Sequence, residues 1–369
     1  MNIPRLQSAR LIAAFACVAT AACATGTGPA NSHFFLERSY VGPVVHDDTL
    51  LYEAQAAAHI FLLDDLNGAF AKISQDPSRD WSGAFRIIMS PMFLIRQLND
   101  SSSAVRTPSF MPQLSVEYLY VSRMSDATGP AANLRFSPVL VRGLRLTLAH
   151  HSNGQAGCFR EGFEPIDRHA NVCVPEAGFD TNIVKLNRAN GDFSTTYLQA
   201  MVHTTIMNRA AGDRPTHTFG LAAAYDYHLR GIFGALSDEQ RQLYGSWRTH
   251  LMGEAMQVIG SQCNDGATRP WNQYLACQFQ GRARVSAEYV RGPRNPGPLA
   301  LRINPPILPW SDQLEFSYTF NALLGTGLFV RWHDGQDYYN INFVNRRRVF
   351  MYGIMLDASA LPRIGPAVH

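Results

Sequence analysis

Two residues in the stretch Ala149–Gln155 could together carry nucleophilic chemistry. The stretch reads Ala-His-His-Ser-Asn-Gly-Gln, so that His150 and Ser152 are two positions apart. On a β-strand, residues two apart point to the same face, which would make the His150 imidazole and the Ser152 hydroxyl neighbours. An imidazole beside a seryl hydroxyl can take its proton, and this pairing is the one that acyl transfer uses. A His-x-Ser pair on a strand is equally compatible with an ordinary polar strand end.

The residues before this pair alternate as a strand requires. The face that carries His150 and Ser152 also carries Leu144, Leu146 and Leu148. The opposite face carries Arg145, Thr147, Ala149 and His151. A hydroxyl and an imidazole on an apolar outer face are costly unless they have partners and a purpose. We therefore expect the pair to open toward an apolar medium, and we interpret His151 as a structural residue of the other face.

Other segments alternate with the same period of two. They include residues 114–120, 219–227, 282–289 and 314–320. A soluble β-sandwich would show the same alternation. Two features favour a membrane barrel: the segments run about ten residues with aromatic residues near their ends, and many opposite faces carry Arg, Glu and Ser. With roughly ten to thirteen such segments between about residue 50 and Leu356, the sequence predicts an all-β fold, an antiparallel transmembrane β-barrel of about 12 strands.

The first 24 residues have the pattern of a secretory signal peptide. Arg5 and Arg10 precede the short apolar run from Leu11 to Ala22, and small residues follow it. This predicts cleavage after Ala24, with lipidation of Cys23 as the alternative. Residues 25–369 then form one barrel domain with an irregular N-terminal arm over residues 25–45. The segment Thr49–Leu66 fits either a helix or a first strand, and the final strand is expected to end near Leu356.

Charge and cysteine content restrict the partners and the compartment. The formal net charge of +3 falls to +1 without Arg5 and Arg10 (3 − 2 = 1), and no long basic run suggests nucleic acid. Two of the six cysteines lie in the signal peptide. The other four form pairs that are close in sequence, Cys158 with Cys173 and Cys263 with Cys277. In an oxidising compartment we expect two loop disulfides, and a metal cluster is the alternative that the spacing disfavours.

The pentad His-His-Ser-Asn-Gly at a strand end, residues 150–154, resembles the HxSNG motif of the outer-membrane phospholipase A family. Two further stretches are similar to that family in the same chain order. The first contains Gln97-Leu98-Asn99, Ser101-Ser102-Ser103, Arg106 and Pro112-Gln113-Leu114. The second is the final hairpin, from Gly335 through Asp337-Tyr338-Tyr339 to Asp357. The resemblance covers roughly residues 85–357, although residues 155–192 have no counterpart.

The resemblance implies a role for each residue of the pentad. Ser152 would be the nucleophile, His150 the general base, and the backbone N–H of Gly154 a donor to the oxyanion. The family has an Asn on the next strand that orients the histidine. Aligning the aromatic residues of the segment from Asp192 to Tyr197 puts Ser194 at that position, and its parity places it on the same face as His150. Asn190 is the alternative third residue.

The resemblance also implies a calcium ion beside the site. Its ligands, carried over by position, would be the backbone carbonyls of Ser102 and Gln155 and a side chain of Asn190 or Asp192. The sequence Asn190-Gly191-Asp192 is also typical of a plain turn. The long segment 158–188 follows the motif, and we hold two interpretations of it: a lid or wall for the lipid headgroup, or an ordinary surface loop.

The expected protein is thus a calcium-dependent phospholipase A in the bacterial outer membrane. It would cleave acyl esters of membrane phospholipids or lysophospholipids and could pair into a calcium-linked homodimer, as the family does. Three alternatives remain open from the sequence: a lipid A deacylase, which also uses His-x-Ser on a lipid-facing strand; a non-enzymatic porin-like barrel; and the soluble sandwich. The length and the C-terminal hairpin favour the phospholipase over the deacylase.

Overall fold

The wall of the protein is a closed antiparallel β-barrel of 12 strands. The structure is a computed structural model, and it describes residues 34–45, 50–76, 78–98, 105–124, 138–166, 173–182, 185–187, 190–209, 215–230, 236–259, 281–294, 309–320, 325–339, 343 and 345–356. The expected signal peptide at 1–24 and the expected Cys263–Cys277 bridge lie outside these residues. The described part contains no helix that is both long and apolar enough to cross a bilayer.

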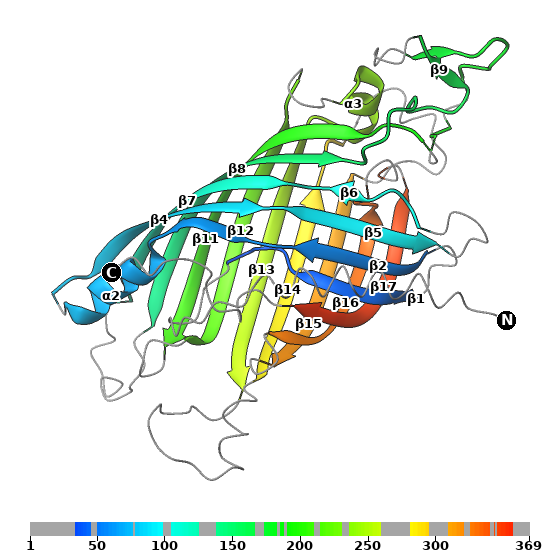
Figure 1. The fold of residues 1–369 in the computed structure, drawn as a ribbon. Helices are drawn as coiled ribbons and strands as arrows, with labels where there is room; N and C mark the ends of the chain where they lie inside the picture. Colours follow the sequence, from blue (N-terminus) through cyan, green and yellow to red (C-terminus); the bar gives the residue numbers. More distant parts are fainter. Residues whose placement is uncertain are drawn as a thin grey trace.

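Nine of the strands are single elements. They are β1 (Ser39–Val45), β8 (Val139–Ser152), β11 (Ser194–Arg209), β12 (Pro215–His228), β13 (Trp247–Ile259), β14 (Gly281–Arg291), β15 (Trp310–Phe320), β16 (Thr326–Gln336) and β17 (Arg346–Leu356). The other three are each interrupted once: β2 (Leu50–Ala57) with β3 (Ile60–Asp64), β4 (Trp81–Ser90) with β5 (Met92–Leu98), and β6 (Ser109–Phe110) with β7 (Gln113–Arg123). Each strand pairs with the next, and β17 closes the ring by pairing with β1 (Figure 1).

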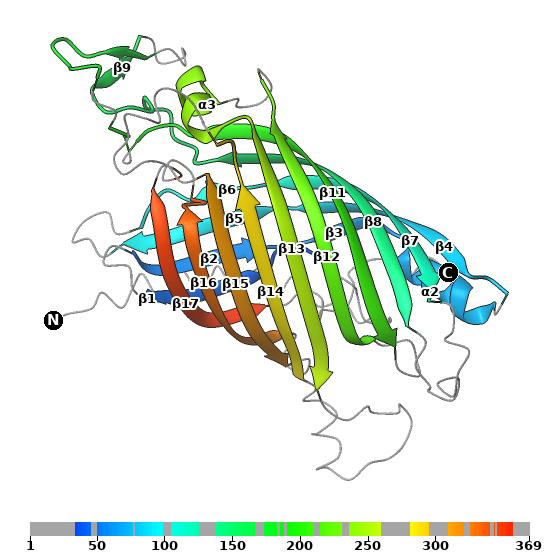
Figure 2. The ribbon, with the colours of Figure 1, turned by 180° about the vertical axis from the view of Figure 1, so that it is seen from behind.

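Small elements lie at the two ends of the barrel. Helix α2 (Leu66–Gln75) packs at one end, where its apolar side contacts Val121, Val139 and Met207. Helix α3 (Asp238–Tyr244) and the two-stranded sheet of β9 (Phe163–Pro165) and β10 (Cys173–Pro175) lie beyond the opposite end (Figures 1 and 2). This second end is also where β8 finishes at Ser152. Ser39 is the first residue of the first strand and Leu356 the last residue of the last strand, and the two pair with each other at the end of the barrel where α2 packs.

The two sides of the wall differ as the alternating sequence predicts. The outward residues are large and apolar, and they include Leu144, Leu146, Leu148, Leu198, Val202, Leu221, Tyr225, Leu251, Phe316, Leu328, Tyr352 and Ile354, all of them exposed. The inward residues are largely polar and buried. The strands form one closed barrel and not two packed sheets, so the sandwich alternative is wrong for this chain.

Buried ion pairs and a chain segment lie inside the barrel. Glu117 is fully buried between Arg86, Arg145 and His203, which come from three different strands. A second cluster joins Glu315 to Arg38 and Arg331. Residues 34–38, the segment before β1, run through this interior: the carbonyl of Phe34 accepts a hydrogen bond from Arg145, and Phe35 packs against His203.

Two expectations about chain segments need correction or completion. Residues 39–45 are strand β1 and not part of an irregular arm. The pair Gly42-Pro43 hides the alternation in the sequence, but a side chain at Gly42 would lie 2.1 Å from the carbonyl oxygen of Tyr352, so glycine allows the closing strands to approach. The ambiguous segment Thr49–Leu66 forms β2 and β3, and helix α2 begins at its last residue.

Candidate functional site

The last two outward residues of β8 are His150 and Ser152. In the sheet, β8 lies between β6–β7 and β11, and Ser152 is paired with Phe110 on one side and with Ser194 on the other. The backbone N–H of His150 donates to the carbonyl of Pro112. Both side chains are half-buried, and the leucines that precede them on their face are exposed, Leu146 at 56%. His151 points to the interior, where it is 7% exposed, as expected.

Thr196 contacts the His150 ring. Its Oγ1 lies 2.9 Å from His150 Nδ1, and the two residues are directly opposite in the β8–β11 register. Ser194 stands two residue pairs further along, opposite Ser152, and Asn190 lies before the strand begins. The hydrogen bond to the His150 ring thus comes from Thr196, whereas the expected orienting residues were Ser194 or Asn190; which residue orients the histidine stays a prediction.

A threonine can orient a catalytic histidine, but less strictly than an amide can. The hydroxyl can accept a hydrogen bond from Nδ1–H, which leaves the lone pair on Nε2 available as a base. The same hydroxyl can also donate to Nδ1, and this arrangement puts the proton on Nε2. An Asn carbonyl only accepts and would select the first tautomer. Thr196 therefore fixes the position of the ring more firmly than its protonation.

We expect Thr196→Val to lower kcat by roughly ten- to a hundredfold, because one orienting hydrogen bond is worth about 1–3 kcal/mol in such a site. Thr196→Asn should keep the wild-type kcat or exceed it, since the amide oxygen selects the active tautomer. The matched control is Thr195→Val, which removes a neighbouring hydroxyl that contacts His228 on the inner face. Ester hydrolysis measured on all three variants checks this, and equal rates for Thr196→Val and the wild type would remove Thr196 from the site.

The turn after Ser152 is held by one side chain, Asn153. Its Oδ1 accepts hydrogen bonds from the backbone N–H groups of Gln155 and Phe193, and its Nδ2 donates to the carbonyl of Gly191. Gly154, at the tip, has φ +66°, a left-handed conformation that glycine adopts without strain. The turn is thus tied to the segment that leads into β11. The backbone N–H of Gly154 comes two residues after Ser152, which keeps it the candidate oxyanion donor.

The expected calcium ligands lie around this tied turn, apart from Ser102, which is outside the described residues. Gly157 bridges to Asn190 and Asp192 through two backbone hydrogen bonds, and this brings the Gln155 side of the turn close to both. Burial raises the pKa of Asp192 to about 6, so this carboxylate is costly to ionise without a nearby cation. All of these donors are oxygens, which suits a hard cation. The described residues contain no group of three or more His, Cys, Asp or Glu side chains that could bind a metal.

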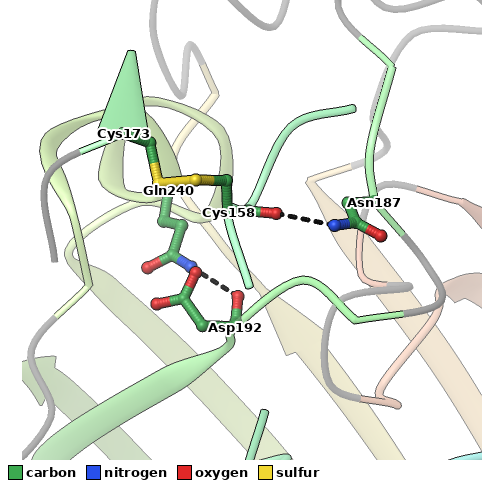
Figure 3. Close-up of a disulfide and its surroundings, with 5 residues drawn as sticks. All are labelled: Cys158, Cys173, Asn187, Asp192 and Gln240. Carbon is green, nitrogen blue, oxygen red and sulfur yellow. Dashed lines mark hydrogen bonds between the residues drawn. A yellow bond between two sulfur atoms is a disulfide. The ribbon is translucent and has the colours of Figure 1, made fainter. Parts of the chain in front are cut away.

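The segment that follows the turn is fastened at its base. The predicted Cys158–Cys173 disulfide is present, Asn187 donates to the carbonyl of Cys158, and Gln240 of α3 donates to the carbonyl of Asp192 (Figure 3). Phe159 stacks on Phe343, which in turn contacts Phe193 and Tyr244. These contacts fix the base of the loop, and the choice between a wall for the lipid headgroup and an ordinary surface loop stays open. A lid motion stays a prediction.

Two residues of the site were missed by the reading of the sequence. Thr196 shares the parity of His150, but its place opposite the ring depends on a register that parity does not supply. Asn153 stands inside the motif, yet its three hydrogen bonds become visible only once β11 is in place. Comparisons of the chain with models of known families, with curated proteins and with solved structures found no match.

Proposed function

We propose that this protein is an outer-membrane esterase that hydrolyses the acyl esters of phospholipids, similar in chemistry to the outer-membrane phospholipase A family. The observation that carries the proposal is the contact of His150 Nδ1 with Thr196, beside Ser152, on an outward face that is otherwise apolar. A base oriented by a third residue and placed next to a hydroxyl is the arrangement of an activated serine nucleophile.

The outer face supports placement in a membrane, with the site at its border. Arg142 and Ser152 are ten positions apart on the same face of β8, and the outward residues between them are apolar except for the site itself. Ten residues span about 33 Å of strand, or about 25 Å across the membrane at a tilt of about 40°. That length matches the apolar band of outer-membrane barrels, about 25 Å tall. The acyl chains of a lipid could therefore stay in the bilayer while its ester group reaches Ser152.

The positions of the first and last strand residues and of the longest connection indicate how the barrel is oriented in the membrane. In bacterial barrels the short turns face the periplasm and the longer loops face outward. Ser39 and Leu356 lie at the end opposite Ser152, and the 41-residue connection 153–193 lies at the Ser152 end (193 − 152 = 41). We therefore place His150 and Ser152 at the outer interface of the membrane.

The reaction follows from the positions of the groups. His150 Nε2 takes the proton of Ser152 as the seryl Oγ bonds to the ester carbonyl carbon, and the carbonyl oxygen becomes an oxyanion. The Gly154 N–H stabilises that oxyanion. When the ester C–O bond breaks, His150 returns the proton to the leaving lysophospholipid alcohol. Water, deprotonated by His150, then releases the fatty acid from Ser152. Asp192 would help to hold a calcium ion, which would supply positive charge that stabilises the oxyanion.

The ion pairs and the chain segment inside the barrel favour an enzyme over a porin-like channel. Buried ion pairs and the segment 34–38 occupy the space through which a porin would conduct. The test of the proposal is hydrolysis of a defined phosphatidylcholine in mixed micelles by the purified barrel, together with covalent labelling by a fluorophosphonate. We expect release of fatty acid and a label on Ser152. Absence of both, combined with ion conductance in planar bilayers, would replace the proposal by the channel.

We expect hydrolysis to fall at least about tenfold in a calcium chelator and to recover on addition of calcium, because the ion stabilises the oxyanion. Asp192→Asn should raise the half-saturating calcium concentration by about ten- to a hundredfold. The matched control is Asp180→Asn in the same loop, where the exposed carboxylate accepts a hydrogen bond from the Asn182 N–H. Activity that is unchanged by the chelator would rule calcium out.

A further inference from the structure

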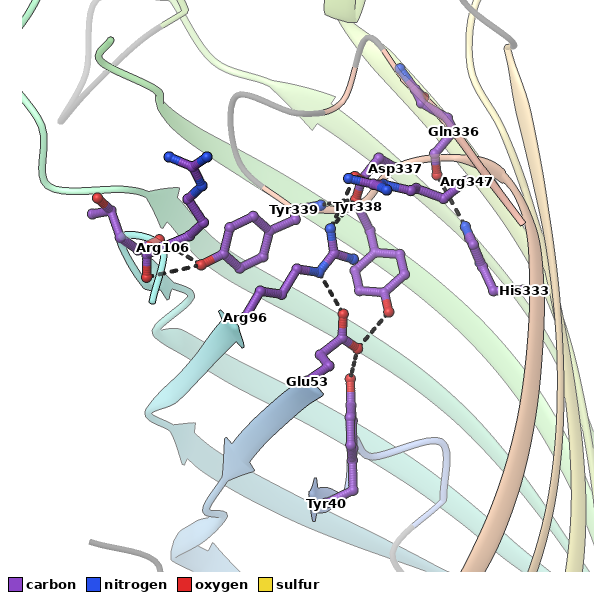
Figure 4. A network of polar contacts seen from close by, with 11 residues as sticks. Tyr40, Glu53, Arg96, Arg106, His333, Gln336, Asp337, Tyr338, Tyr339 and Arg347 are labelled. Carbon is purple, nitrogen blue, oxygen red and sulfur yellow. Dashed lines mark hydrogen bonds and ion pairs between the residues drawn. The ribbon is translucent and has the colours of Figure 1, made fainter. Parts of the chain in front are cut away.

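A further cluster of polar residues, centred on Asp337, lies inside the barrel and apart from the residues of the proposed site. Asp337 is buried and receives both hydrogen bonds of the Arg96 Nη1 group, at 2.7 and 2.9 Å, and one from Arg347. Arg96 also donates to Glu53 at 2.6 Å, and Glu53 accepts from the hydroxyls of Tyr40 and Tyr338 (Figure 4). Every carboxylate in this cluster therefore has a cation and at least one further donor.

One member of the cluster reaches toward the site. The backbone N–H of Tyr339 donates to Asp337, and its ring packs on the Arg96 guanidinium, 4.6 Å from the ring centre. Its hydroxyl donates to the carbonyl of Thr107 at 2.6 Å (Figure 4 shows it beside Arg106). The backbone of Arg96 also accepts a hydrogen bond from the N–H of Arg106. The cluster therefore holds the segment 106–107 through two separate contacts.

The same segment touches the catalytic turn. The side chain of Thr107 accepts a hydrogen bond from Gln155 Nε2 at 3.2 Å, and Phe110, three residues on, pairs with Ser152 in the sheet. Gln155 itself donates its backbone N–H to the Asn153 side chain that shapes the turn. A continuous chain of contacts thus leads from Asp337 through Tyr339, Thr107 and Gln155 to the turn beside Ser152.

We propose that the buried cluster of Arg96, Asp337 and Tyr339 is a positioning device for the catalytic turn, acting through the Thr107–Gln155 contact. Within the cluster, Tyr339 is the residue whose side chain contacts the segment 106–107, through the hydrogen bond from its hydroxyl. The inference rests on the proposed function for its effect on catalysis, but the mechanical part of it concerns the order of the turn alone. None of these residues touches the substrate.

The experiment compares Tyr339→Phe with Tyr338→Phe. Each variant removes one hydroxyl that donates a hydrogen bond, to Thr107 O or to Glu53 Oε1, and each keeps a ring packed on Arg96. We expect Tyr339→Phe to lower kcat about three- to tenfold with KM unchanged, and Tyr338→Phe to leave kcat within about twofold. Thr107→Val should produce a similar loss, and combining it with Tyr339→Phe should add little, because both act through one segment.

Hydrogen exchange separates this inference from the proposed function, since it needs no activity. Peptides that cover 105–110 and 153–155 should exchange faster in Tyr339→Phe than in Tyr338→Phe or the wild type, in detergent at equal thermal stability. Equal exchange in the two variants overturns the inference whether or not the barrel is an enzyme. Faster exchange in a barrel that hydrolyses no ester leaves the positioning device standing and removes only the proposed function.

Discussion

Ser152→Ala should reduce ester hydrolysis by at least about a thousandfold and should abolish labelling by a fluorophosphonate. The seryl Oγ forms the covalent bond in the proposed reaction, and removal of the nucleophile from such a site usually costs between a thousand- and a millionfold in kcat. The substitution deletes one half-buried hydroxyl at a strand end, so the barrel itself should be unchanged. Fatty-acid release from mixed micelles measures the loss.

Ser194→Ala is the matched control for this experiment. Ser194 is paired with Ser152 across β8 and β11 and has the same half-buried character, but the contact with His150 Nδ1 belongs to Thr196. We expect its kcat to stay within about threefold of the wild type, as for an ordinary polar substitution. Activity retained by Ser152→Ala would contradict the nucleophile. A loss at Ser194 as large as that at Ser152 would return Ser194 to the site.

Glu117→Gln should destabilise the barrel by about 3–5 kcal/mol, because it leaves buried cations without their counter-charge. Glu117 is 0% exposed and lies 3.1 Å from Arg86 Nη1 and 2.7 Å from Arg145 Nη2, with His203 Nε2 at 3.1 Å. The amide keeps the volume of the carboxylate, so no cavity forms and the loss of charge accounts for the effect. Urea unfolding in lipid vesicles, followed by tryptophan fluorescence, measures the free energy of unfolding.

Glu161→Gln provides the comparison at the surface. Glu161 pairs with Lys185 on the exposed loop, and such pairs contribute about 0–1 kcal/mol because water screens both charges. The contrast between the two variants tests whether the interior of the barrel is the closely paired network described above. A Glu117→Gln barrel as stable as Glu161→Gln would show that water reaches this interior and screens it.

The barrel wall could be predicted because its sequence signal is local. On β8, the alternation of residues from Leu144 to Ser152 predicts which face of the strand each side chain lies on, and the structure confirms all of these faces. Strand β1 was missed because Gly42-Pro43 interrupts that local signal, and the strand forms from its pairing with β17, which is more than 300 residues away in the sequence. Helix α3 also has a local sequence signal, the capping box formed by Ser237 and Gln240.

The site could be predicted only in part, for a related reason. His150 and Ser152 lie on one strand, so parity alone brings them together. The third residue comes from another strand, and its identity depends on the register between β8 and β11. If the register of β11 against β8 shifted by two residues, every side chain would keep its face, but Ser194 would stand opposite His150 in place of Thr196. The alternation of faces therefore cannot distinguish the two residues. The cluster around Asp337 joins five separate segments (β1, β2, β5, 337–339 and β17), and neither composition nor spacing predicts that they come together.

The Cys158–Cys173 disulfide, in the connection between β8 and β11, has a consequence for how the protein depends on its compartment. Bridging Cys158 to Cys173 removes 15 residues from a connection of 41, which lowers the entropy cost of joining β8 to β11 by only about 0.4 kcal/mol. The pairing of these long strands therefore does not need the bridge. The small sheet of β9 and β10 does, because two strands of three residues have little else to hold them. An oxidising environment therefore matters more for the small sheet of β9 and β10 than for the pairing of β8 with β11.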